Sequence, residues 1–187
     1  MNRKSSNKTT KSGKFWFALD NAAKIYPAII TEKITAVFRL TVMLNYPVKI
    51  KSLQRAVLQA EKCFPFFRVQ LRKGFFWYYL EHLPKHFPVE FDEQRFCRKF
   101  PKGSLLIRIL VKDNSISLEC SHILTDGTGA FEFLKTILIL YSEECGAEIP
   151  AKYQINNADS WVSEEKYEDA YNRYFKTDIP PMVKRSK

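Results

Sequence analysis

Residues 115–127 read Ser-Ile-Ser-Leu-Glu-Cys-Ser-His-Ile-Leu-Thr-Asp-Gly, and the first seven of them alternate polar and apolar side chains. This period of two predicts a half-buried β-strand over residues 115–121. The residues from Ala130 to Tyr141 are rich in apolar helix formers and follow two glycines, so we expect a helix there. His122 therefore stands where a strand gives way to a helix, and the strand behind it can fix the direction of its ring.

The rest of the chain shows similar local patterns. An alternating stretch over 34–44 predicts a strand, and apolar residues on one face of 51–62 predict an amphipathic helix. We expect one hairpin from 66–71 and 75–81 with its turn at 73–74, a second from 104–111 and 115–121, and a short strand at 89–91. Residues 15–28 are expected to be irregular with a short helical turn.

The composition suits one folded body of ordinary size. The chain has 187 residues, 45% of them hydrophobic, and 15 phenylalanines, enough to bury a core. No apolar run has the length of a membrane span, and no apolar segment follows the basic N-terminus as a secretory signal requires. The four cysteines are far apart without a Cys-x-x-Cys pair, which favours a reduced, cytoplasmic protein over a disulfide framework.

The net charge of +10 is concentrated at the two ends of the chain. Five of these charges lie in residues 1–14 and three in residues 180–187, and the body between them is nearly balanced. Basic ends of this kind are typically disordered and solvated, so we do not expect nucleic acid to be the main partner.

Metal binding is also not expected. His82 and His86 have helical spacing, but Pro84 between them breaks a helix, and the motif histidine has no second histidine nearby.

The motif and its neighbours resemble a known superfamily. His122-x-x-x-Asp126-Gly127 between a strand and a helix is similar to the signature of the chloramphenicol-acetyltransferase-like, CoA-dependent acyltransferases, which include alcohol O-acetyltransferases and the condensation domains of peptide synthetases. Residues 19–28, Phe38-Arg39-Leu40 and the aromatic run 75–80 are similar to the alcohol acetyltransferase branch, and the resemblance covers about Phe15 to Tyr141.

The resemblance implies roles for named residues. His122 would be the general base that takes a proton from an acceptor hydroxyl or amine as it attacks the thioester of acyl-CoA. Asp126 would turn away from the imidazole and pair with an arginine, for which Arg68 is the first choice and Arg108 the second. Gly127 would keep space open for substrate. The alternatives are a strand-end histidine held by backbone groups and an aspartate that only caps a helix.

The resemblance also implies an α+β fold, with a mixed, largely antiparallel sheet and helices packed mainly on one face. Family members have two lobes, and this sequence lacks the Asp-Phe-Gly-Trp-Gly element of the second. We therefore expect a basic tail over 1–14, an N-terminal acyltransferase lobe over 15–150, and over 151–187 a polar linker, an amphipathic helix with an aromatic stripe, and a basic tail. A truncated, half-tunnel lobe would need a second lobe in trans or a homo-oligomer.

Two functional classes remain open at this point. The first is an acyltransferase with acyl-CoA as co-substrate, a small-molecule acceptor and no permanently bound cofactor. The second is a non-catalytic remnant or interaction lobe that keeps the fold. A carrier-protein-dependent condensation domain is a weaker third reading, because such domains usually carry His-His where this chain has Ser121-His122.

Overall fold

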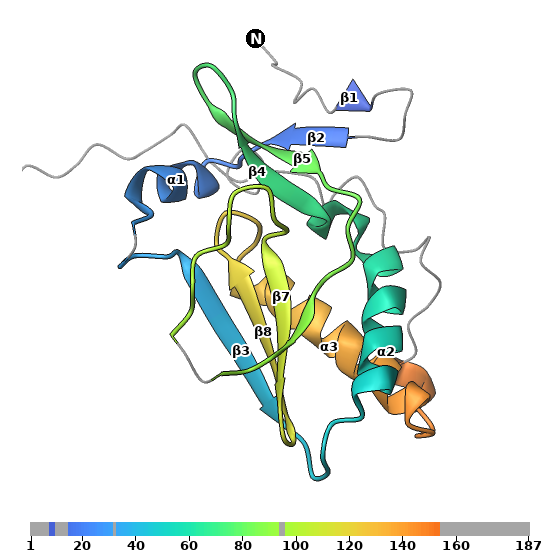
Figure 1. Cartoon of the computed structure of the whole chain (residues 1–187). Coiled ribbons are helices and arrows are strands. Elements are labelled where there is room, and N and C mark those ends of the chain that lie inside the picture. The colour runs from blue at the N-terminus through green and yellow to red at the C-terminus, as the bar shows by residue number, and fades with distance from the viewer. Residues whose placement is uncertain (1–7, 10–14, 32, 94–95, 154–187) are drawn as a thin grey trace, which may run out of the picture.

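The strands form two sheets of four. The structure, a computed structural model, describes residues 8–9, 15–31, 33–93 and 96–153. One sheet has the order β1-β2-β5-β4 and the other the order β3-β8-β7-β6 (Figure 1). The strands are β1 Lys8–Thr9, β2 Phe15–Ala18, β3 Val37–Met43, β4 Val69–Lys73, β5 Tyr78–His82, β6 Val89–Phe91, β7 Ile107–Lys112 and β8 Ser115–Ser121. All neighbours are antiparallel except β6 and β7, which confirms the predicted α+β class.

Two long helices pack together on one face of the β3-β8-β7-β6 sheet (Figure 1). They are α2, Ile50–Cys63, and α3, Gly127–Glu144; the shorter elements are α1 Tyr26–Ile29, η1 Ala23–Ile25, η2 Pro65–Phe67 and η3 Ala151–Tyr153. In α2 the apolar residues recur on one face, so Leu53, Ala56, Val57 and Ala60 are buried. In the described part of the chain, no helix combines the length and the hydropathy that crossing a bilayer would require.

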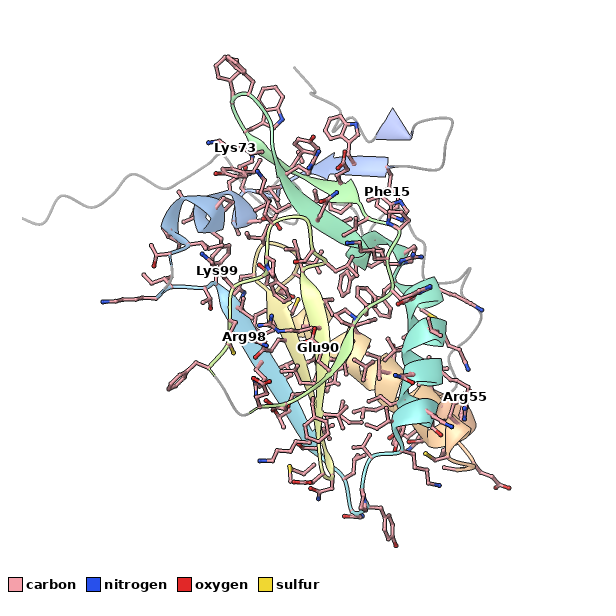
Figure 2. The ribbon with its side chains drawn as sticks, viewed as in Figure 1. Phe15, Arg55, Lys73, Glu90, Arg98 and Lys99 are labelled. Carbon is pink, nitrogen blue, oxygen red and sulfur yellow. The ribbon has the colours of Figure 1, made fainter. Side chains whose placement is uncertain are left out.

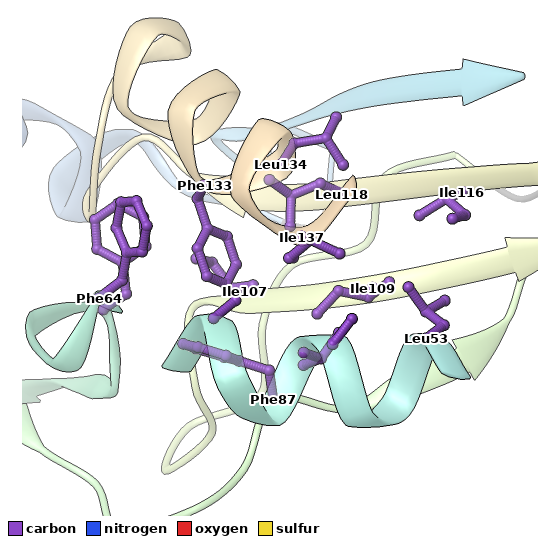
Figure 3. Packing of buried hydrophobic residues seen from close by; sticks show 14 of the residues in the cluster. Leu53, Phe64, Phe87, Ile107, Ile109, Ile116, Leu118, Phe133, Leu134 and Ile137 are labelled. Carbon is purple, nitrogen blue, oxygen red and sulfur yellow. The ribbon is translucent and has the colours of Figure 1, made fainter. Parts of the chain in front are cut away.

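The main core lies between this sheet and the two helices. Ile116, Leu118 and Cys120 alternate along β8 toward the helices, as the period of two requires (Figure 3). Phe133 of α3 sits among aromatic rings from the end of α2 and the following segments. A smaller core forms under the other sheet and includes Leu80 and Ile123. Residues 122–124 thus turn at the junction of the two cores.

The opposite face of the β3-β8-β7-β6 sheet buries charge. Glu119, in the middle of β8, accepts hydrogen bonds from Arg39 on β3, at 2.5 and 3.0 Å, and from Arg108 on β7 at 2.5 Å. Asp92 makes a second contact with Arg39, 2.8 Å long. Burial alone would lower the pKa of Arg39, but its hydrogen bond to Glu119 and the charges of Glu119 and Asp92 raise it overall.

The structure corrects two local predictions. Residues 15–18, expected to be irregular, form strand β2 and pair with β5. The first hairpin turns later than predicted, because its second strand begins at Tyr78 and Phe75 to Trp77 belong to the turn. Tyrosine, phenylalanine and tryptophan favour strands, so propensity alone extended β5 too far. The predicted aromatic helix and the C-terminal basic tail lie outside the described residues. Within the predicted N-terminal tail the structure describes Lys8–Thr9, which form β1 and pair with β2. The domain bounds stay a prediction.

Candidate active site

Strand β8 and a tight turn position His122. Its backbone N–H donates to the carbonyl of Ala36, 2.9 Å away, at the entrance to β3. Leu124 N–H donates back to the carbonyl of Ser121 over 2.9 Å, which closes the turn. Ala36 holds a φ of 49°, a left-handed conformation that a non-glycine residue adopts only when its surroundings enforce it. The backbone at this strand end is therefore fixed on both sides.

The imidazole of His122 is half-buried and packs against two aromatic rings. The ring of Phe38 lies 4.3 Å away between centroids, and that of Tyr26 is stacked at 5.3 Å with an interplanar angle of 12°. No side chain or backbone group of the described residues hydrogen-bonds to either ring nitrogen. Neither nitrogen is thus committed to a partner among these residues, and the unprotonated nitrogen of a neutral imidazole is a proton acceptor.

Asp126 does not pair with an arginine, so this expectation is wrong. Its side chain is the N-cap of α3, where Oδ1 accepts a hydrogen bond from the backbone N–H of Gly129 at 2.9 Å. The residue is exposed, and within the described ranges it has no ion-pair partner. The alternative reading of a helix cap is the correct one, because the first backbone N–H groups of a helix have no partner within the helix.

The two candidate arginines are engaged elsewhere. Arg68 donates from Nε to the carbonyl of Lys85, 3.1 Å away. Arg108 is buried against Glu119 and also donates to the carbonyl of Arg98 at 2.6 Å. Its guanidinium lies 4.7 Å from the ring centroid of Phe100. Its counter-ion is therefore a neighbouring strand residue and not the motif aspartate.

Replacing Asp126 with alanine should lower the free energy of unfolding by about 1 kcal/mol, the ordinary value of an N-cap. Asp126→Asn, which keeps the acceptor oxygen, should lose only a small part of that. Urea unfolding of both variants measures the difference. A loss of about 3 kcal/mol or more for Asp126→Ala would instead indicate a buried ion pair and contradict the cap assignment.

Gly127 borders open space. A Cβ built at Gly127 would meet no atom within 4 Å, whereas one at Gly129 would collide with the side chain of Thr125. A side chain at Gly127 would thus extend into open space at the start of α3, whereas the missing side chain of Gly129 leaves room for Thr125 in the turn. The role of Gly127 beside a substrate stays a prediction.

Two cavities of the described part of the chain lie away from the imidazole. One, of about 540 Å³, has four cationic side chains and one acidic side chain in its lining: Lys85, Arg98, Lys99, Arg108 and Glu90. Figure 2 labels Arg98, Lys99 and Glu90. The other, of about 640 Å³, is mainly apolar and runs between β3 and α3. His122 lines neither of them. The first has a mixed lining, in which Arg108 is already paired with Glu119, and the second has mainly apolar surface.

The other side chains that could react or bind a metal ion have structural roles. Burial raises the pKa of the Cys120 thiol, which disfavours the thiolate that a nucleophilic cysteine requires. His86 hydrogen-bonds through Nδ1 to the buried Glu61 at 2.7 Å, and His82 stacks on Phe15, so the two histidines do not converge. Within the described ranges, no three histidine, cysteine or acidic side chains are grouped to hold a metal ion.

One buried contact could have been found from the sequence. The two-residue turn of the β7–β8 hairpin pairs Lys112 with Ser115, and this register places Arg108 opposite Glu119. The position and length of a hairpin turn set the register of the two strands, and hence every cross-strand pair. The packing of Tyr26 and Phe38 around His122 has no comparable local signal, because α1 and β3 reach the motif only through the tertiary fold.

Comparison with known proteins identifies the fold. No family model matches the sequence, and no curated protein matches it. Among solved structures, the starter condensation domain of rhizomide synthetase RzmA superposes with a TM-score of 0.57 at 16% identity, over 73% of this chain and 40% of that one. The tallysomycin biosynthesis protein TlmII gives 0.54 at 10% identity, over 73% and 40%.

Polyketide synthase associated protein 5 from Mycobacterium tuberculosis gives a TM-score of 0.53 at 12% identity, over 69% of this chain and 33% of that one. The chain thus spans about 40% or less of these larger structures. Its α+β body has the fold of one part of the condensation-domain-like proteins.

Proposed function

We propose that this chain is one lobe of an acyltransferase, with His122 as the general base and acyl-CoA as the donor. The observation that supports this most is the half-buried imidazole at the end of β8, whose ring nitrogens make no hydrogen bond to the residues that the structure describes. The fold shared with condensation domains and the His-x-x-x-Asp-Gly spacing agree with it.

The proposed step transfers one acyl group. A hydroxyl or amine of the acceptor gives its proton to Nε2 of His122 as its oxygen or nitrogen attacks the thioester carbonyl carbon. The tetrahedral intermediate then breaks its carbon–sulfur bond. CoA leaves as a thiolate and takes the proton back from the imidazolium, so the ester or amide forms and His122 returns to its neutral state.

The lobe is proposed to need a partner surface for this step. The chain spans only about 40% of the length of the solved structures that it matches. Rate enhancement of acyl transfer depends on holding donor and acceptor in reacting geometry, and one wall of a tunnel positions them poorly. A second lobe in trans, or a second copy of this chain, would supply the other wall.

Replacing His122 with glutamine should abolish most acyl transfer, with a loss of roughly a hundred-fold or more, because the other base of the motif, Asp126, is engaged as the N-cap of α3. The measurement is CoA release from acetyl-CoA with a panel of alcohols and amines, in the presence of the second lobe if a separate one is found. His86→Gln is the matched control, since it removes an exposed imidazole remote from the motif while glutamine can still donate a hydrogen bond to Glu61.

Equal rates in wild type and His122→Gln would contradict the catalytic assignment. The imidazole of His122 would then serve only to pack against the rings of Tyr26 and Phe38. This packing supports the non-catalytic alternative. His122→Gln would then lower the melting temperature while leaving any transfer activity unchanged.

A further inference from the structure

The tip of the β4–β5 hairpin exposes three consecutive aromatic side chains, Phe75, Phe76 and Trp77, here called the aromatic apex. Their exposed fractions are 90%, 81% and 60%. Figure 1 shows this hairpin extending beyond the body of the molecule. A folded chain buries most of its large aromatic residues, so three in a row at one projecting tip indicate a surface meant for an apolar environment.

The aromatic apex is held in a defined turn. Lys73 pairs with Tyr78 across the hairpin, and the N–H of Gly74 donates to the carbonyl of Trp77 over 2.7 Å. A Cβ at Gly74 would lie 3.1 Å from that carbonyl oxygen, so glycine suits this close approach. The rings also contact one another, with Phe75 edge-on to Phe76 at 4.5 Å and Trp77 stacked at 6.4 Å. The three rings therefore form one presented unit.

A cation stands directly behind the rings. Figure 2 shows Lys73 at the base of the apex, and its Nζ lies 6.0 Å from the ring centroid of Tyr78. Arg72 beside it is partly neutralised by Glu81 at 3.2 Å. The aromatic side chains lie at the tip of the hairpin, and a lysine and a tyrosine lie behind them. A bilayer surface has the complementary arrangement, because its anionic headgroups lie outside its acyl chains.

We propose that the aromatic apex inserts into the interfacial layer of an anionic lipid membrane, with Lys73 at the headgroups. A protein partner fits the geometry less well. A stable protein interface buries about 800 Å² on each side, which the tip of a two-stranded ribbon does not offer. Insertion into lipid requires only a few aromatic side chains, and it is helped by the positive net charge of the chain.

The test is sedimentation of the full chain with vesicles of phosphatidylcholine and phosphatidylserine in equal amounts. The triple variant Phe75→Ser, Phe76→Ser, Trp77→Ser should bind at least about ten-fold more weakly than wild type. Phe96→Ser is the matched control, because Phe96 is 96% exposed outside the hairpin and should leave binding unchanged. Both variants keep the same basic ends, so charge attraction by those ends cancels from the comparison.

Two further measurements make the result specific. Lipids brominated in the acyl chains should quench the tryptophan fluorescence of wild type and quench the Trp77→Phe variant less. Lys73→Gln should weaken binding to the anionic vesicles about five-fold and leave binding to pure phosphatidylcholine unchanged. Equal melting temperatures of the variants would show that all are folded, as expected for exposed sites.

Three outcomes would overturn the proposal. The first is that wild type does not sediment with vesicles, and the second is that the triple variant binds as tightly as Phe96→Ser. The third is that the wild type self-associates by analytical ultracentrifugation and the triple variant does not, with vesicle binding equal in both. That last result would assign the aromatic apex to a contact between copies of this chain.

Discussion

Replacing Phe133 with alanine should lower the free energy of unfolding by about 3–5 kcal/mol, the largest effect that we expect from one apolar substitution. Phe133 has no exposed surface, and its ring lies edge-on to those of Phe64, Phe67 and Phe87 at centroid distances of 5.1, 5.5 and 5.2 Å. These partners come from the end of α2, the turn after it and the segment before β6, so alanine would leave a cavity where three parts of the chain meet.

Phe131 supplies the control for this prediction. It lies two residues earlier on α3 and is 56% exposed, so Phe131→Ala removes the same atoms from the same helix with little loss of packing. We expect a change below about 1 kcal/mol, since alanine is also the better helix former. Urea unfolding followed by circular dichroism measures both variants. Similar losses in the two would contradict the proposed placement of the core.

Replacing Glu119 with alanine should cost a comparable amount, about 3–5 kcal/mol, for an electrostatic reason. Glu119 is 1% exposed and is the shared partner of Arg39 and Arg108. Removing its carboxylate takes away the counter-ion of the buried Arg108 guanidinium and one of the acidic partners of Arg39. The loss measures the penalty of an unpaired buried charge, which exceeds the net value of the intact cluster.

Glu132→Ala is the matched control for the buried carboxylate. Glu132 pairs with Lys135 at 3.0 Å on the exposed side of α3, where solvent screens the interaction. Its loss should change the free energy of unfolding by less than about 1 kcal/mol. Thermal and urea unfolding of the two alanine variants provide the comparison. If Glu119→Ala and Glu132→Ala have the same free energy of unfolding, the buried cluster does not stabilise this fold.

The two stability predictions bear on the proposed function. Phe133 lies on the helix that Asp126 caps, and Glu119 lies on the strand that ends at His122. A variant that unfolds would lose activity for a trivial reason, so any test of His122 requires unfolding curves beside the rates. A His122→Gln protein with wild-type stability and reduced transfer would isolate the chemical role of the imidazole.

Local pattern predicted the elements but misplaced one turn. Period-two alternation identified β3 and β8, and the apolar faces identified α2 and α3, because each element buries one side against a common core. The aromatic apex was assigned to a strand because Phe and Trp favour strands. What placed it in the turn is the register of β4 against β5, in which Lys73 and Tyr78 are the last pair.

Residues close together in the chain suffice to predict that a histidine follows a strand and that a carboxylate precedes a helix. The alternation predicted a half-buried strand, but β8 is buried on both faces, because Glu119 packs against Arg39 and Arg108. Which charges meet depends on the tertiary structure. Arg39 lies opposite Glu119 through the pairing of β3 with β8, eighty residues apart in sequence. A buried guanidinium needs a counter-ion, and the register of the sheet brings the carboxylate of Glu119 within reach. Asp126 is exposed to solvent, so its carboxylate needs no arginine and caps α3.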